Sequence, residues 1–487
     1  MKRYMNKKLL ISAVVTTLLL TLSVSNVNAT QKKLNNRDAF LKAETNTTDD
    51  PRRVPMPEGL FEPQGSTVLV GGRVFDGTGS SARFATVVLT GKKVSAILSP
   101  DSKAWPEGAK VINVDGKTVM PGLIDLHVHM AYEEQGGMFP SHSSEADAAL
   151  RSVERLRYYI ESGITTVRDV GSPGHVPFRL KSWVVQNRLP LPRIYAAGQI
   201  IVGRGGHGTE GQTAEEVERK GLARIAIGPD DWREAVREQF AKGADLIKIG
   251  SHFSTQEIKA AVDEAHSLGI KVTVDAETFY VKRAIEAGAD MIEHPLPRSP
   301  ETIKLMAKNG VESIPTLIPY QIIFDLMGGY YGSTSRRFTF DEASIRQMLK
   351  DFKKAGIKMG IGTDLVADWF RRLPTAYVLE LKEFVKAGYS ISEALVAATK
   401  TNAEILDMGN KLGTIEVGKL ADLIVVDGKP DEDLDDLVNI DLVIRNGFVV
   451  VKDGRTYTPR HKEKSVNGWP GIKPANSKMA DSIASDK

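Results

Sequence analysis

Residues 121–129 read Pro-Gly-Leu-Ile-Asp-Leu-His-Val-His, and this stretch decides how the rest of the chain is interpreted. Asp125, His127 and His129 fall two residues apart, so in a β-strand their side chains point to one face. The positions between them are apolar, which is typical of a strand buried on both sides. We therefore predict a buried strand over residues 122–126 that ends by presenting the two histidines together.

Seven more short apolar runs follow this strand, and segments with helical spacing separate them. We predict the further strands at residues 164–169, 193–202, 244–249, 270–274, 289–292, 311–316 and 357–362, with helices that include 145–162, 231–242, 255–268 and 341–355. Alternating strands and helices favour a parallel sheet covered by helices, and eight repeats favour a closed barrel over an open sheet. The fold class is therefore α/β, with a (β/α)8 TIM barrel over residues 121–409.

The segments on either side of the predicted barrel have a different sequence pattern, without the alternation of strands and helices. Short β-type runs punctuated by Asp-Gly, Gly-Gly and Asn-Gly turns fill residues 66–120 and return in residues 410–457. We expect these two pieces to form one small β-sandwich domain. Residues 30–65 are a polar lead-in segment, and residues 458–487 are a polar tail rich in Lys, Ser, Asn and Pro.

The first 29 residues have the pattern of a secretory signal peptide. Four cations in the first eight residues precede an apolar run over residues 9–24, and Val-Asn-Ala follows at 27–29. The alternative is an uncleaved anchor, although the run is shorter than the ~20 residues that span a bilayer. We expect a secreted, periplasmic protein with no stable membrane span after signal removal.

The amino-acid composition excludes fibrous and disordered proteins. The 487 residues include 41% hydrophobic and 26% charged residues, an ordinary globular composition. Loss of residues 1–29, with four cations and no anion, would change the formal net charge from +3 to −1, so we expect no nucleic-acid partner. Cysteine is absent, so a bound metal must use His, Lys, Asp or Glu. The sequence leaves an oligomer open.

Ionisable residues recur where the predicted strands end. Lys248 lies near the end of the fourth strand, His294 ends the sixth and Asp364 ends the eighth. Each alone has an ordinary interpretation as a cap, a satisfied polar group or a lysine that reaches solvent. Together with His127 and His129 they meet at the carboxyl ends of the strands, the face that carries active sites in such barrels. We therefore predict a divalent metal site, with zinc as the expected ion.

The chain from about residue 66 to residue 457 resembles the amidohydrolase superfamily, in the branch that contains imidazolonepropionase-like enzymes and metal-dependent Xaa-Pro dipeptidases. Several motifs occur in the same order as in that family. They are PGLIDLHVH, ITTVRDVG, GGHG, ADLIKI, IEH, GTD and ADLIVV. The resemblance implies a metal-dependent hydrolase that acts on a small molecule or dipeptide.

The resemblance also implies roles for individual residues. His127 and His129 would bind one divalent ion with Asp364, which would also act as general acid and base. Lys248 would be carboxylated and bridge two ions, and His294 would hold the second ion.

The fifth predicted strand departs from the family pattern. The family usually ends this strand with a metal-binding histidine, whereas residues 272–277 here read Val-Thr-Val-Asp-Ala-Glu and place Asp275 there. One interpretation is that Asp275 binds a second ion more weakly or selects a harder metal, because a carboxylate adds negative charge. The other is that Asp275 is only a supporting or structural carboxylate.

Three further features have a functional and an ordinary interpretation. His207, in the glycine-rich loop after the third strand, would face the substrate carbonyl or simply lie in a flexible loop. Arg371 and Arg372 would bind a substrate carboxylate or lie on the surface. Residues 324–338, rich in Gly and aromatic residues, would form a lid or a packed surface loop.

The sequence thus predicts a secreted metal-dependent amidohydrolase that cleaves a C–N bond of an amide or dipeptide, with Xaa-Pro dipeptides among the candidates. A metal-activated water would attack the carbonyl. One alternative is a lactone or ester hydrolase with the same site. Another is a non-catalytic binding protein with a degenerate metal site, for which Asp275 is the sequence argument.

Overall fold

The structure is a computed structural model that describes residues 63–132, 144–209, 213–276, 279–294, 298–327, 341–366 and 368–457. The predicted signal peptide, nearly all of the lead-in segment and the polar tail lie outside these ranges. The described residues between 63 and 457 belong to one compact unit. Within them, no helix combines the length and the apolar character that a bilayer crossing needs.

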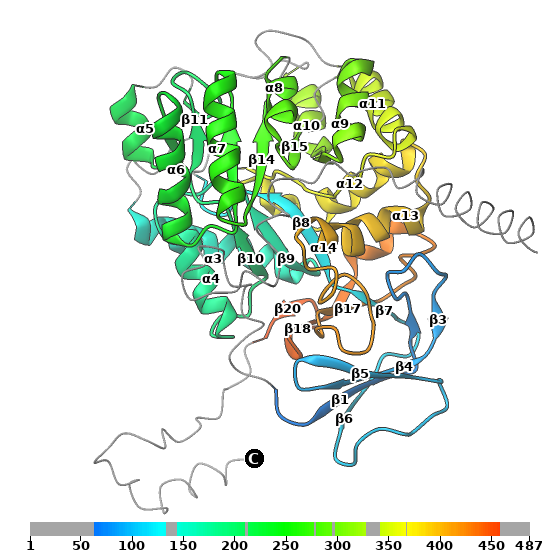
Figure 1. The fold of residues 1–487 in the computed structure, drawn as a ribbon. Helices are drawn as coiled ribbons and strands as arrows, with labels where there is room; N and C mark the ends of the chain where they lie inside the picture. Colours follow the sequence, from blue (N-terminus) through cyan, green and yellow to red (C-terminus); the bar gives the residue numbers. More distant parts are fainter. Residues whose placement is uncertain are drawn as a thin grey trace, which may run out of the picture. The chain divides into compact units, whose positions relative to one another are not determined.

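Parallel strands form the centre of the fold (Figure 1). One sheet has the order β10-β9-β8, and another has the order β12-β11-β13-β14-β15-β16. Every neighbouring pair in these two sheets is parallel. The strands are β8 (Leu123–Val128), β9 (Ile164–Asp169), β10 (Arg193–Ala196), β11 (Ile200–Val202), β12 (Ala223–Ile225), β13 (Leu246–Gly250), β14 (Lys271–Asp275), β15 (Met291–Glu293) and β16 (Glu312–Ile314).

Residues 357–362 close the barrel without forming the regular eighth strand that we predicted. Their backbone bonds to β16 through Ser313 and to β8, where the Leu126 N–H donates to the Ile361 carbonyl. The Asn402 side chain forms hydrogen bonds with the Ile361 backbone, where a continuous strand partner would otherwise do so. Oδ1 of Asn402 accepts from the Ile361 N–H at 2.9 Å, and Nδ2 donates to the Ile361 carbonyl at 2.9 Å. The barrel itself is confirmed, with one extended segment in place of its eighth strand.

The predicted third strand over residues 193–202 is also divided, into β10 and β11. Gly198 separates them with φ +77°, a left-handed conformation that glycine adopts without strain. A Cβ atom at this position would lie 2.5 Å from Oε1 of Gln239 and 2.8 Å from Cζ of Phe178, so a larger residue would displace these side chains.

Helices with one apolar face cover the strands. In α11 (Glu342–Lys354), the Asp341 side chain caps the first turn, and the buried residues Ile345, Met348, Leu349 and Phe352 follow helical spacing. The other helices connected with the barrel are α3 (Glu145–Glu161), α4 (Val176–Val185), α5 (Ala214–Lys220), α6 (Pro229–Lys242), α7 (Thr255–Ser267), α8 (Phe279–Ala287), α9 (Pro300–Asn309), α10 (Leu317–Met327), η3 (Trp369–Arg372), α12 (Thr375–Lys386), α13 (Ile391–Val396), η4 (Ala397–Thr401) and α14 (Asn402–Ile405).

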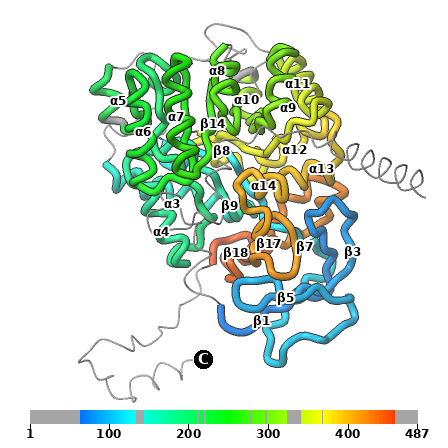
Figure 2. Tube along the Cα trace, viewed as in Figure 1, coloured from blue at the N-terminus to red at the C-terminus, as the bar shows by residue number. Residues whose placement is uncertain are grey.

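Strands from the two ends of the described chain share one sheet, as Figure 2 shows by the blue segments beside the orange and red ones. A seven-stranded sheet has the order β20-β19-β18-β17-β7-β2-β3, and a four-stranded sheet has the order β5-β4-β1-β6. The two segments meet where β17 pairs antiparallel with β7. The boundaries of a separate domain stay a prediction, since the described residues form one unit.

The strands of these two sheets are short. They are β1 (Ser66–Val70), β2 (Arg73–Val74), β3 (Arg83–Phe84), β4 (Thr86–Thr90), β5 (Lys93–Leu98), β6 (Lys110–Asn113), β7 (Thr118–Pro121), β17 (Leu423–Val426), β18 (Ile440–Arg445), β19 (Phe448–Lys452) and β20 (Arg455–Thr456), with a short helix η5 (Leu434–Val438). Apolar side chains from both sheets, among them Leu69, Val87 and Leu423, form one buried cluster. The two sheets therefore pack through a common core.

Candidate metal centre

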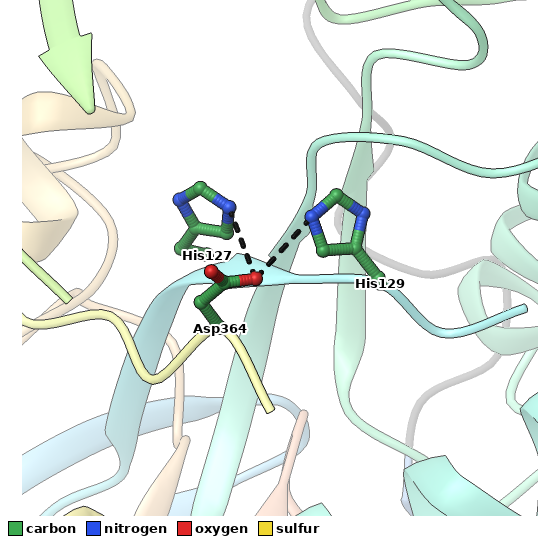
Figure 3. A group of neighbouring side chains, drawn as sticks. All are labelled: His127, His129 and Asp364. Carbon is green, nitrogen blue, oxygen red and sulfur yellow. Dashed lines mark ion pairs between the residues drawn. The ribbon is translucent and has the colours of Figure 1, made fainter. Parts of the chain in front are cut away.

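His127, His129 and Asp364 come together at the carboxyl end of β8 (Figure 3). Oδ1 of Asp364 lies 3.5 Å from Nε2 of His127 and 3.4 Å from Nε2 of His129. The three potential ligand atoms all lie within 4.8 Å of one another. The first strand and the extended segment in place of the eighth strand thus bring together three of the predicted site residues.

Hydrogen bonds to the other ring nitrogens orient both imidazoles. Nδ1 of His129 lies 3.0 Å from the carbonyl oxygen of Gly171, which only accepts, so this nitrogen carries the proton and Nε2 keeps its lone pair. Nδ1 of His127 lies 2.8 Å from Oε2 of Glu293. Both rings therefore direct an unprotonated Nε2 toward Asp364, the arrangement found when a second group supports a metal-binding histidine.

Glu293 is itself held in place by buried partners that our sequence analysis did not identify. Nη2 of Arg168 lies 2.5 Å from its Oε1, and the hydroxyl of Thr273 donates to the same oxygen. Arg168, Thr273 and Glu293 come from β9, β14 and β15 and are fully buried. An arginine inside a predicted buried strand was a usable signal, because a buried charge needs a partner.

The two imidazoles suit metal binding. Burial lowers the pKa of His129 to about 3 and holds that of His127 well below its usual range, so both rings are neutral. Nε2 of His127 is buried, yet no hydrogen-bond partner from the described residues reaches it. A buried nitrogen without a partner is rare, and a cation beside its lone pair accounts for it. The donor set of two imidazoles and one carboxylate fits a divalent ion such as zinc.

Asp364 combines burial with a strained backbone. Burial raises the pKa of its carboxyl to about 6. Its φ is +46°, and His294 and Thr316 at the ends of neighbouring strands have φ +65° and +47°. Non-glycine residues in this region cost about 1–3 kcal/mol each and cluster at functional sites. Strain at these three strand ends marks the same face of the barrel as the histidines.

Asp125 connects the first strand with the segment that carries Asp364. Its Oδ1 accepts from the backbone N–H groups of His127 and Thr363, each at 3.0 Å, and its Oδ2 accepts from the Thr363 hydroxyl at 2.5 Å. Burial raises the pKa of Asp125 to about 7. The carboxyl group thereby fixes the spacing between His127 and the residue next to Asp364.

A second cluster surrounds Asp275 at the end of β14. Its Oδ2 lies 3.0 Å from Nε2 of His294, 3.3 Å from Nε2 of His207 and 3.7 Å from Nζ of Lys248. Burial alone would raise the pKa of Asp275, but His294, His207 and Lys248 outweigh it and hold the pKa well below its usual range. The structure therefore places His207, in the loop after β11, beside Asp275, with 30% of its side chain exposed.

His294 has both ring nitrogens in hydrogen bonds. Nδ1 lies 2.8 Å from the Thr316 hydroxyl, and Nε2 lies 3.0 Å from Asp275. An ionised carboxylate only accepts, so Nε2 of His294 carries a proton and donates it. His294 thus binds Asp275 through the nitrogen that would otherwise offer a lone pair.

The remaining predicted site residues lie outside these two clusters. Arg371 and Arg372 are exposed on η3, and Nη2 of Arg371 lies 3.9 Å from Oε1 of Glu154 on α3. Their role toward a substrate carboxylate stays a prediction. The proposed lid over residues 324–338 lies outside the described residues from 328 onward, while residues 324–327 belong to α10.

A parallel barrel with two neutral histidines and an aspartate at the carboxyl ends of its strands defines a class of hydrolytic barrel proteins. The chain belongs to the Amidohydrolase family, whose model matches residues 118–450. The family is generally metal-dependent, which agrees with the candidate site at His127, His129 and Asp364. The protein is therefore a hydrolase of this family.

Individual relatives support the same assignment. The chain is 23% identical over 382 residues to an imidazolonepropionase of Geobacillus sp., covering 71% of this chain and 84% of the relative. It is 25% identical over 411 residues to an ochratoxinase of Aspergillus niger, covering 76% and 82%. A solved prolidase structure in complex with N-methylphosphonate-L-proline is 30% identical with a TM-score of 0.70, covering 80% of this chain and all of that chain.

Proposed function

We propose that this protein is a metal-dependent amidohydrolase that cleaves the C–N bond of a small amide or dipeptide. The observation that carries the proposal is the convergence of Nε2 of His127, Nε2 of His129 and Oδ1 of Asp364 in a buried site. The similarity to a prolidase makes Xaa-Pro dipeptides the first substrates to test. N-acyl amino acids, which also contain an amide C–N bond, are the next substrates to test.

His127, His129 and Asp364 would hold the ion. A bound divalent ion lowers the pKa of water and polarises a carbonyl group. Asp364 supplies the proton transfers: its carboxylate accepts a proton from the attacking water and returns it to the leaving nitrogen.

Hydrolysis with controlled metal loading tests this proposal. The full-length protein is dialysed against a chelator and assayed with Xaa-Pro dipeptides, N-acyl amino acids and lactones before and after addition of zinc or manganese. We expect amide or dipeptide hydrolysis that is lost with the metal and restored by it. His127→Asn should abolish this activity, whereas His175→Asn, at an exposed histidine on the N-terminal side of α4, should not.

Each alternative has a distinct outcome in the same experiment. Hydrolysis of lactones without amides would assign the site to acyl–oxygen bonds. Metal binding without hydrolysis of any of the three classes would favour a non-catalytic binding protein.

We also propose that the protein is secreted after removal of residues 1–29, on the basis of the sequence pattern there. N-terminal sequencing of the protein recovered from the periplasm or medium tests this. A mature chain beginning near residue 30 is expected, and an N-terminus at Met1 would contradict cleavage.

A further inference from the structure

The position of Asp275 raises the question of how many ions this site holds. Among the described residues, the only three His, Asp or Glu side chains with ligand atoms within 4.8 Å of one another are His127, His129 and Asp364. A second ion would have to use the side chains around Asp275. The contacts of His207, His294 and Lys248 decide whether it can.

His207 and His294 lie too far apart to share an ion with Asp275. Oδ2 of Asp275 is 3.3 Å from one imidazole and 3.0 Å from the other, yet the three do not form a group within 4.8 Å. The two imidazole nitrogens are therefore more than 4.8 Å from each other. Two ligands with bonds of about 2.1 Å can lie at most about 4.2 Å apart on one ion.

His294 contacts Asp275 and Thr316 through its two ring nitrogens. Its Nε2 lies 3.0 Å from the Asp275 carboxylate, and its Nδ1 lies 2.8 Å from the Thr316 hydroxyl and 3.9 Å from Oδ2 of Asp364. His294 therefore lies between Asp275 and a carboxylate of the first ion site.

The charge of Asp275 bears on the chemical state of Lys248. Nζ of Lys248 is buried and lies 3.7 Å from Oδ2 of Asp275, and within the described residues no hydrogen bond reaches it. An ammonium group is attracted to this carboxylate. A carbamate on the same nitrogen would place a second negative charge beside it in a buried site, where like charges repel strongly.

We propose that this protein binds one divalent ion per chain, and that an ion pair between unmodified Lys248 and Asp275 occupies the place of a second ion. This inference rests on the proposed function, because both concern one site. Asp275 thereby compensates the buried lysine directly. His294 completes the cluster through its hydrogen bond to Asp275, and His207 lies beside the same carboxylate, with Nε2 3.3 Å from Oδ2.

Metal content and the state of Lys248 test the inference without an activity assay. The full-length protein is incubated with excess zinc and ¹³C-bicarbonate and desalted. Its zinc content is then measured by mass spectrometry, and a lysine carbamate is sought by ¹³C NMR. We expect about one zinc per chain and no carbamate signal. Two ions per chain, or a carbamate in the unaltered protein, would overturn the inference.

The variant Asp275→His should restore the second site. Without the carboxylate, the Lys248 amine can attack CO2; a new N–C bond forms, one N–H proton passes to water and a carbamate results. We expect a twofold rise in zinc content together with the carbamate signal. A folded variant that stays at one zinc without a carbamate would show that Asp275 does not replace the second ion.

Two further variants keep the test decisive if Asp275→His fails to fold. Asp275→Asn removes the charge without adding an imidazole, so zinc should stay at one per chain; loss of that zinc would place Asp275 at the first ion and overturn the inference. Asp290→Asn removes a buried carboxylate that pairs with His266 at 2.9 Å in the same barrel. It should change neither the zinc content nor the carbamate signal. No zinc in the unaltered protein would instead remove the proposed function.

Discussion

Nδ1 of His127 lies 2.8 Å from Oε2 of Glu293, and both side chains are fully buried. Glu293 in turn accepts from Arg168 and Thr273, so four side chains from β8, β9, β14 and β15 fix the direction of one ring nitrogen. The site therefore depends on contacts across the barrel that the strand motif alone does not contain.

Glu293→Gln should weaken zinc binding. The amide leaves His127 less strongly oriented and less basic, and loss of such a supporting group costs about 10- to 100-fold in metal affinity. Competition with a chromogenic chelator measures the zinc Kd. Asp290→Asn, which alters a buried carboxylate–histidine pair away from the site, is the matched control. Equal zinc affinity for Glu293→Gln and the unaltered protein would show that Glu293 does not support His127.

Asp364→Asn should abolish turnover while the protein stays folded. The amide cannot accept the proton of water, and loss of a general base lowers kcat by about 10²- to 10⁴-fold. Steady-state rates on the best dipeptide measure the effect, and circular dichroism and Tm report the fold. A variant with normal kcat would exclude Asp364 from the proton transfer.

Titration of Glu380 should make the free energy of unfolding depend on pH. Its carboxylate accepts from the backbone N–H groups of Leu317 and Ile318, each at 3.0 Å, at the start of α10. Burial raises the pKa of Glu380 from 4.5 to about 8. Between these values the folded protein binds more protons than the unfolded chain, so this group makes stability fall as pH rises, by at most about 1.4 kcal/mol per pH unit.

Glu380→Gln removes this titration and keeps an oxygen that accepts a hydrogen bond. Urea unfolding at several values between about pH 5 and pH 7.5 measures the free energy of unfolding of both proteins. The slope against pH should be less negative in the variant. Parallel slopes would mean that the Glu380 carboxyl titrates alike in the folded and unfolded protein.

The site could be predicted as far as strand order determines it. His127 and His129 follow from alternation in one strand, and Asp364 follows from the rule that strand ends share one face of a barrel. Glu293 as the partner of His127 could not be predicted, because that pairing depends on how side chains meet across the barrel interior. The contact of His207 with Asp275 depends on a loop conformation that local sequence does not specify.

Two strands show where the fold prediction failed. The run at residues 193–202 is largely apolar, but Gly198 takes a left-handed conformation and the next N–H, of Gln199, donates to the Gln239 side chain at 3.1 Å, which divides the run into β10 and β11. The run at residues 357–362 has the composition of a strand, but a side chain about forty residues later, that of Asn402, forms hydrogen bonds with the backbone N–H and carbonyl of Ile361. Both deviations come from tertiary contacts that overrule a local pattern.

That side chain, Asn402, should stabilise the closed barrel. Its Nδ2 donates to the carbonyl groups of Ile124 at 2.6 Å and Ile361 at 2.9 Å, and its Oδ1 accepts from the Ile361 N–H at 2.9 Å. Asn402→Ala would remove these three bonds, and a buried backbone group left without any partner costs about 1–3 kcal/mol. The Ile361 carbonyl keeps its bond from Leu126 and the Ile124 carbonyl keeps its bond from the Tyr377 hydroxyl at 2.7 Å, so only the Ile361 N–H loses its partner. We therefore expect a loss of about 2 kcal/mol in the free energy of unfolding. Asn309→Ala, which removes one partly buried bond to the Leu305 carbonyl in α9, should cost about 1 kcal/mol or less. Urea unfolding compares the two variants, and equal losses would mean that Asn402 contributes no more to stability than an ordinary helix-end amide.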